Sequence, residues 1–258
     1  MDVFVPYGWL HALTLVVCAL LIAAPTLLGR RLTPDAELSL RRALAALAVA
    51  YWLTYAIGWN WHGLDLRTGL PLQVCDISGL VAPFALLTGW RWLRATLYFW
   101  TSALTLQAFI QPTLKAGPAG PAAPVFWAFW AAHTIIAACA VYDVVVGGFR
   151  PRWSDLGRVL LVSAAYLALV VPVDVQLGAN YGFVGNPADA GEVPPFINAL
   201  GPWPQRAIIL VALTMVGFVI VLTPWLGWRA AAARTAARGL AAPQTPSADA
   251  DERASPIG

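Results

Sequence analysis

A thiol and a carboxylate stand next to each other at the start of one apolar segment, and a histidine lies inside another. Cys75 and Asp76 fall in the run LPLQVCDISG, which begins at Leu70, and His133 falls in FWAFWAAHTII, which begins at Phe126. Ionisable side chains are costly to hold in hydrocarbon, so they are hypotheses for functional sites until a partner explains them. A cysteine and a histidine that meet supply a nucleophile and its general base.

Both residue types also have a structural explanation. Cysteine is often a compact buried hydrophobe, and an intramembrane histidine often donates a hydrogen bond to a neighbouring helix. Cys18 and Cys139 lack polar neighbours and fit the structural explanation directly. Cys75 differs because Asp76 adjoins it and because Pro71 favours a helix start nearby. A thiol near the positive end of a helix is more easily ionised, so both explanations stay open.

Other polar side chains are candidates for binding a substrate beside this pair. Two of them flank the cysteine, two glutamines lie one helical turn apart and can face one cavity, and two lie in an external loop. An asparagine amide, or backbone N–H groups at the start of the third span, could stabilise an oxyanion. The candidate substrate-binding residues are Asp76, Gln73, Gln107, Gln111, Asn180 and Tyr181.

Several kinds of site are excluded by the sequence. Lys115 is the only lysine and lies in a predicted loop, so the seventh span cannot carry a retinal-type Schiff base. No glycine-rich phosphate loop, HExxH or CxxC pattern occurs. His11 and His62 lie near the outer interface and are expected to be structural, at depths that do not suit shared haem ligation with His133. We therefore predict no metal site and no cofactor.

The elements that must position these residues are membrane helices. The chain is 59% hydrophobic and 11% charged, with a mean hydropathy of +0.68, which is far from the balance of a soluble domain. A spanning helix needs about 20 mostly apolar residues, and seven stretches have this length. We expect an all-α integral membrane protein, a seven-transmembrane helix bundle with spans near 8–28, 43–61, 71–89, 92–112, 124–146, 156–177 and 206–227.

The cations predict the orientation of this bundle. Of the 16 lysine and arginine residues, all but Arg67, Lys115 and Arg206 fall in links on one side of the predicted spans. Positive charge is retained in the cytoplasm, so the N-terminus is expected outside and the C-terminus in the cytoplasm. The net charge of +3 then reflects topology and does not indicate nucleic-acid binding.

The chain divides into a membrane domain and a tail. Residues 1–228 form the predicted seven-helix domain, and the external connection 178–205 combines turn-forming Gly, Asn and Pro with aromatic residues that could pack as a lid. Residues 229–258 are rich in Ala, Pro and Ser, which predicts a disordered cytoplasmic tail. If the third span starts at Pro71, Cys75 lies roughly 6 Å deep and His133 roughly 13 Å deep, a mismatch that only tilt or an earlier start of the third span would absorb.

Several motifs together resemble a known family. They are the pair Cys75 and His133, separated by 58 residues, and the segments WLH at Trp9, LPLQVCD at Leu70, LQAFIQP at Leu106, NYGF at Asn180 and GPWP at Gly201. In these the chain resembles bacterial YwaF-like integral membrane proteins, relatives of the vertebrate transmembrane protein 164. One departure is Gln73, which stands where many bacterial members carry histidine.

The resemblance implies a lipid acyltransferase in a bacterial plasma membrane. Cys75 would form an acyl-thioester from a phospholipid, and His133, as general base and acid, would assist transfer of the acyl chain to a lysophospholipid. Its partners would be these lipids and the bilayer. Two alternatives remain. Asp76, His133, Asp143 and Asp174 could be proton or cation sites of a transporter or small-molecule-binding protein, or the chain could be a non-catalytic scaffold.

Overall fold

The computed structural model describes residues 4–60, 63–112, 120–187 and 193–241, with side chains as far as Arg229. These residues form helices and turns, and no strand occurs among them. Four of the described helices are long and apolar enough to cross a membrane: α1 (Trp9–Gly29), α6 (Pro124–Val145), α7 (Trp153–Leu177) and α9 (Gln205–Ala241). The all-helical membrane architecture is therefore confirmed.

The remaining helices are shorter or carry charged residues. These are α2 (Pro34–Trp59), α3 (Val74–Thr88), α4 (Arg91–Trp100), the π-helix η1 (Thr101–Thr105), α5 (Gln107–Ile110), the 3-10 turns η2 (Gly120–Ala122) and η3 (Tyr181–Phe183), and α8 (Pro195–Asn198). The run of α4, η1 and α5 coincides with the predicted span 92–112. Each of the other six predicted spans coincides with one of the helices α1, α2, α3, α6, α7 and α9.

Local sequence explains several helix ends. Pro34 and Pro124 occupy the first turns of α2 and α6, where a missing N–H costs nothing. Gly89 and Gly178 follow α3 and α7 at φ values of 65° and 63°, the left-handed conformation that glycine adopts without strain. The helix ends thus follow the turn chemistry of the sequence.

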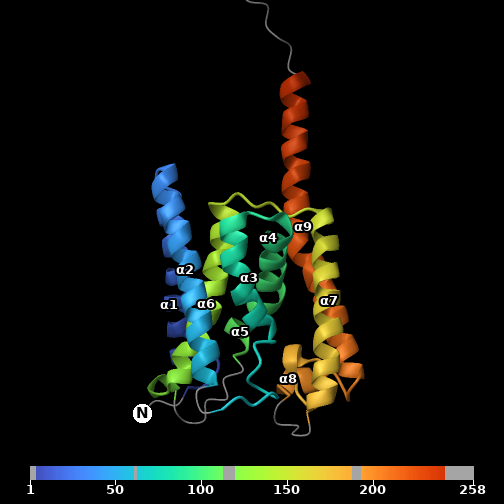
Figure 1. Ribbon diagram of the computed structural model, residues 1–258. Coiled ribbons are helices and arrows are strands. Elements are labelled where there is room, and N and C mark those ends of the chain that lie inside the picture. The colour runs from blue at the N-terminus through green and yellow to red at the C-terminus, as the bar shows by residue number, and fades with distance from the viewer. Residues whose placement is uncertain (1–3, 61–62, 113–119, 188–192, 242–258) are drawn as a thin grey trace, which may run out of the picture.

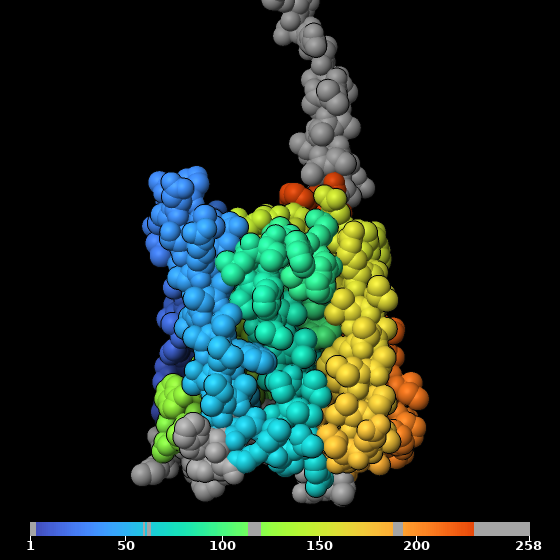
Figure 2. All heavy atoms as spheres, in the orientation of Figure 1, coloured from blue at the N-terminus to red at the C-terminus, as the bar shows by residue number. Residues whose placement is uncertain are grey.

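The helices form a row with α3, α4 and α6 at its centre (Figure 1). Helix α3 packs against α2, α4 and α6, while α1 packs on α6, and α7 packs on α4 and α9. Figure 2 shows α2, α3 and α7 side by side across one face. Helices α3 and α6 run in the same direction, so residues near the start of one can lie level with residues inside the other.

Helix α3 begins later in the chain, and deeper in the bundle, than the predicted span 71–89. The segment before it is extended and rises into the bundle before the first helical turn (Figure 1). Its backbone is held by side chains of other elements: the Leu70 N–H donates to the Tyr181 hydroxyl at 2.9 Å, and the Tyr166 hydroxyl donates to the Leu72 carbonyl at 2.8 Å. Non-helical backbone is tolerated inside a membrane domain where protein groups satisfy it in this way.

The late start corrects the expected depth of Cys75. The prediction assumed that helix begins at Pro71, on the outer surface, whereas Val74 is the first residue of α3. Cys75 therefore lies in the first turn of a helix that begins inside the bundle. The expected mismatch in depth with His133 rested on the wrong start of α3.

The bundle is closed by ion pairs at the end where α3 terminates. Arg94 reaches Asp143 at 2.9 Å, and Arg91 reaches Asp155 at 2.6 Å. The Asp155 carboxylate is fully buried, also receives Arg158 at 2.7 Å and accepts the Arg152 N–H at the start of α7. Because these pairs join α4 to α6 and α7, they fix three helices relative to one another.

The C-terminal segment differs in part from its prediction. Helix α9 continues to Ala241, so residues 229–241 are helical where the sequence predicted a disordered tail. Alanine and arginine, which dominate this stretch, are strong helix formers, a signal in the sequence that the prediction of a disordered tail did not use. Residues 242–258 lie outside the described part of the chain.

Candidate functional site

A cavity of about 1400 Å³ lies between the α2–α3–α6 side of the bundle and the α7–α9 side. Its walls come from most helices, and the described parts of the 178–205 connection also line it, through η3 and α8. Pockets for small ligands measure about 300–1000 Å³. The larger volume and mostly apolar walls suit a ligand with long hydrocarbon chains.

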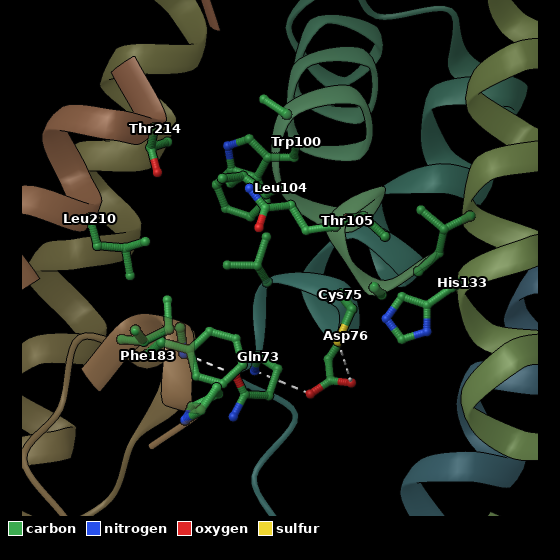
Figure 3. A pocket seen from close by; sticks show the side chains of 18 of the residues that line it. Gln73, Cys75, Asp76, Trp100, Leu104, Thr105, His133, Phe183, Leu210 and Thr214 are labelled. Atoms are coloured by element: carbon green, nitrogen blue, oxygen red, sulfur yellow. Dashed lines mark hydrogen bonds between the residues drawn. The ribbon is translucent and has the colours of Figure 1, made fainter. Parts of the chain in front are cut away.

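Cys75, Asp76 and His133 all line this cavity. Cys75 and Asp76 come from the first turn of α3, and His133 comes from the interior of α6. In Figure 3 the imidazole of His133 faces the thiol and carboxylate across the site. Residues from remote segments are therefore brought to one wall of the same cavity.

The packing of α3 on α6, one turn beyond the site, explains why Cys75 and His133 lie at the same depth in the bundle. Gly79 follows Cys75 by one turn on α3, and Ile136 follows His133 by about one turn on α6. A Cβ atom at Gly79 would lie 3.8 Å from the Ile136 side chain and 3.3 Å from that of Trp52. The Ile136 distance is an ordinary contact, so α3 and α6 pack directly on each other here, and the Cys75 turn lies beside the His133 turn.

The hydrogen bond of His133 fixes its tautomer. Its Nδ1 lies 2.6 Å from the carbonyl oxygen of Phe129, one turn earlier on α6. A carbonyl oxygen only accepts, so Nδ1 carries the proton and Nε2 retains a lone pair. The ring is 7% exposed and packs against Phe129 and Phe109, with centroid separations of 4.4 and 6.3 Å. A neutral, oriented imidazole with a basic Nε2 suits a general base.

Asp76 organises the first turn of α3. Its Oδ2 accepts the Gln73 N–H at 3.1 Å, its Oδ1 lies 3.9 Å from the Cys75 sulfur, and its carbonyl accepts the Trp52 indole N–H at 2.9 Å. The carboxylate therefore caps the helix and is the acceptor beside the resting thiol. Sequence reasoning left its role open between substrate binding, orientation of a base and capping, and its contacts are those of a cap.

Gln73 links the start of α3 to the 178–205 connection. Its side-chain oxygen accepts the Gly182 N–H at 2.9 Å, and its side-chain nitrogen donates to the Asn180 carbonyl at 3.4 Å. Its position lines the cavity, yet both ends of its amide are engaged by protein. Gln73 thus holds the connection against the start of α3.

Asn180 and Tyr181 serve the same connection. The Asn180 side-chain oxygen accepts the Gly185 N–H at 3.2 Å, an arrangement of a turn, although the residue also lines the cavity. Tyr181 is 1% exposed and is not part of the cavity wall; its hydroxyl donates to the Leu66 carbonyl at 3.0 Å. Burial raises the pKa of the Tyr181 hydroxyl, which keeps it protonated and able to donate.

Gln107 and Gln111 both line the cavity, as their spacing predicts. They lie at the start and just past the end of the short helix α5. Both residues are exposed, and both face the cavity. Their amides are the polar groups of this wall nearest in sequence to η1.

The other ionisable candidates lie away from the cavity. Asp143 is paired with Arg94, and Asp174 accepts the Tyr181 N–H at 2.8 Å; neither carboxylate lines the cavity. Both ring nitrogens of His11 bond to backbone, at Tyr7 and Phe109, which matches its expected structural role. The buried thiols Cys18 and Cys139, the expected structural cysteines, do not line the cavity either. His62 and Lys115 lie outside the described residues.

Two groups of cavity residues were missed by sequence reasoning. Tyr51, Trp52 and Tyr55 line it from α2, and their spacing on one helical face was a signal that could have been used. Thr105 lines it from η1, and nothing in the sequence marks a π-helix there. Within the described ranges no three His, Cys, Asp or Glu side chains gather as metal ligands would.

Comparison with known proteins agrees with this architecture. The TMEM164 family model matches residues 6–222, which include every helix that lines the cavity. Neither a curated protein nor a solved structure matches the chain. The match covers most of the sequence and extends from before α1 into α9. The chain is a membrane protein that belongs to the TMEM164 family.

Proposed function

We propose that the protein is a cysteine-dependent lipid acyltransferase. Cys75 is the nucleophile, His133 is the general base and acid, and the cavity holds the acyl chains of a phospholipid and a lysophospholipid. The observation that carries the proposal is that Cys75 and His133 lie on neighbouring turns of α3 and α6, at the wall of one large apolar cavity (Figure 3).

The first half-reaction forms the acyl-enzyme. Nε2 of His133 takes the thiol proton, and the Cys75 sulfur attacks the ester carbonyl carbon of a phospholipid. The new C–S bond moves the carbonyl electron pair onto oxygen. When the carbonyl re-forms, the ester C–O bond breaks, and the imidazolium returns its proton to the departing lysolipid alkoxide.

The second half-reaction reverses these roles with a new acceptor. His133 deprotonates the hydroxyl of a lysophospholipid, whose oxygen attacks the thioester carbon and displaces the Cys75 thiolate. The thiolate recovers its proton from the imidazolium. The proton on Nδ1 takes no part in either half-reaction, so the hydrogen bond from Nδ1 to the Phe129 carbonyl holds the imidazole in one orientation for both.

The proposal includes the topology of the domain. Each of the seven predicted spans coincides with a helical unit of the described chain, and the charge partition favours an N-terminus outside and a C-terminus in the cytoplasm. The mouth lined by Arg67, Thr68 and α8 then opens at the outer face of a bacterial plasma membrane.

The transporter alternative is less well supported by the contacts. It requires intramembrane carboxylates along a path, yet Asp143 is held by Arg94, Asp174 is bound to the 178–205 connection, and neither faces the cavity. Asp76 and His133 do face it, but they lie beside a thiol that a proton path does not require.

Capture of the thioester tests the proposal. Purified protein is incubated with a phospholipid carrying a labelled acyl chain, and hydroxylamine-labile label is located by peptide mass spectrometry. We expect label on the Cys75 peptide of wild type and of the matched control Cys139→Ala, and none in Cys75→Ala. Label that persists fully in Cys75→Ala would reject the nucleophile, and uptake of a solute by vesicles containing Cys75→Ala would favour the transporter.

A further inference from the structure

The π-helix η1 interrupts the α4–α5 run beside the site. At Thr101–Thr105 the carbonyl of Thr101 accepts the N–H of Leu106, five residues on, at 2.9 Å. A π-turn is a wider turn inserted in an α-helix and is frequently found at functional sites. Here η1 packs against both α3 and α6, the helices that carry Cys75 and His133.

The π-turn changes what a threonine hydroxyl can bond. Six threonines of the described helices donate their hydroxyl to the carbonyl four residues earlier, at 2.7–3.4 Å: Thr14, Thr26, Thr54, Thr88, Thr96 and Thr223. The corresponding acceptor for Thr105 is the Thr101 carbonyl, which the π-turn directs to the Leu106 N–H. The Thr105 hydroxyl is buried and has no hydrogen-bond partner among the described residues.

Thr105 lies at the wall of the cavity, and its hydroxyl oxygen is buried in that wall. The residue is 4% exposed and lines the cavity. In the view of Figure 3, Thr105 lies above the Cys75 thiol, on the side away from Asp76. Phe109, one turn further along, contacts the same imidazole. Burying a hydroxyl without a partner is unfavourable, so a ligand that accepts its hydrogen bond removes that penalty.

We propose that Thr105 is an oxyanion donor of this site, an inference that rests on the proposed function. When the Cys75 sulfur bonds to the ester carbon, the carbonyl electron pair moves to oxygen, and the Thr105 O–H donates to that oxyanion. The donor does not transfer its proton; the hydrogen bond weakens again as the carbonyl re-forms and the ester C–O bond breaks. The π-turn thereby frees a fixed donor where negative charge develops.

The test compares Thr105→Val with Thr101→Val. Valine replaces a hydroxyl by a methyl of similar shape, and Thr101 shares the π-turn, the burial and the lack of a partner, but does not line the cavity. The readouts are the rate of acyl-enzyme formation from a labelled phospholipid, and the rate of Cys75 alkylation by iodoacetamide, a displacement at saturated carbon that forms no oxyanion.

Thr105→Val is expected to slow acylation on the order of 10²-fold and to leave alkylation unchanged. Thr101→Val should leave both rates near wild type, and Thr105→Ser should restore most of the acylation rate. Wild-type acylation in Thr105→Val, an equal loss in Thr101→Val, or a parallel loss of alkylation would overturn the assignment. If Cys75→Ala abolishes acylation while Thr105→Val does not, only the role of Thr105 fails; if acylation persists in Cys75→Ala, the proposed function fails with it.

Discussion

Buried polar groups are paired at one end of the bundle and line a cavity at the other. At the ion-pair end, defined by Arg91, Arg94, Asp143 and Asp155, each buried carboxylate receives a guanidinium within 2.9 Å. The Arg91 and Arg94 groups also lie over the Phe149 ring, at 5.4 and 5.1 Å.

The other end, the cavity end, is defined by Cys75, Asp76, Thr105 and His133. Here the groups line a cavity, the hydroxyl of Thr105 lacks a partner in the described structure, and Nε2 of His133 carries a lone pair. The two ends share helix α6 and the continuous run of α4 and η1. The comparison teaches that paired charges join the helices at one end, while the proposed function assigns the polar groups at the cavity end to a ligand.

The largest expected effect comes from the cavity end. His133→Gln removes the proposed base and keeps a polar side chain in its place, and we expect acyl transfer to fall by about 10²–10⁴-fold with a smaller change in thermal stability than a truncation of the packed ring would cause. The measurement is transfer of a labelled acyl chain to a lysophospholipid in vesicles, beside thermal unfolding. Transfer within a few-fold of wild type would remove the distinction between the two ends.

The ion-pair end should respond in stability instead. Arg94→Ala removes the Nε–H that both oxygens of the buried Asp143 carboxylate accept, and breaking a buried pair in this way costs about 3–5 kcal/mol. Unfolding by denaturant in detergent measures the loss, with Arg42→Ala, an exposed arginine, as the matched control. If Arg94→Ala keeps normal stability but loses acyl transfer, the Arg94–Asp143 pair takes part in the reaction and the contrast between the two ends is wrong.

A smaller effect is expected where the start of α3 contacts the 178–205 connection. Gln73→Ala removes the acceptor of the Gly182 N–H and the donor to the Asn180 carbonyl, at about 1 kcal/mol for each hydrogen bond. Amide exchange in 180–184 should quicken, and transfer should fall a few-fold. Unchanged exchange would show that the connection is held by other contacts, such as that of Trp203 with the Val184 carbonyl at 3.1 Å.

Much of the fold could be predicted because bilayer thickness dictates long apolar helices. The seven apolar stretches each coincide with a helical unit, and Pro34 and Pro124 mark helix starts. The start of α3 could not be predicted, since Pro71 is equally compatible with extended backbone, and the groups that stabilise 70–73 come from Tyr166 and Tyr181.

The candidate site was predictable in its reactive atoms and not in its surroundings. A thiol and an imidazole in apolar segments are visible in the sequence, and both line the cavity. The roles of Gln73 and Tyr181 depend on contacts between remote segments, which no local pattern encodes. The π-turn at Thr101–Thr105 arises from how η1 packs between its neighbours, so the free hydroxyl of Thr105 emerges only in three dimensions.

The pairing of Cys75 with His133 is the central claim, and thiol reactivity tests it most directly. In protein carrying Cys18→Ala and Cys139→Ala, Cys75 is the one remaining thiol of the sequence, and its alkylation by iodoacetamide is followed with His133 present and in His133→Gln. The account predicts that alkylation at neutral pH slows at least about tenfold without the imidazole, since the thiolate is the nucleophile. Equal rates in the two proteins would contradict it.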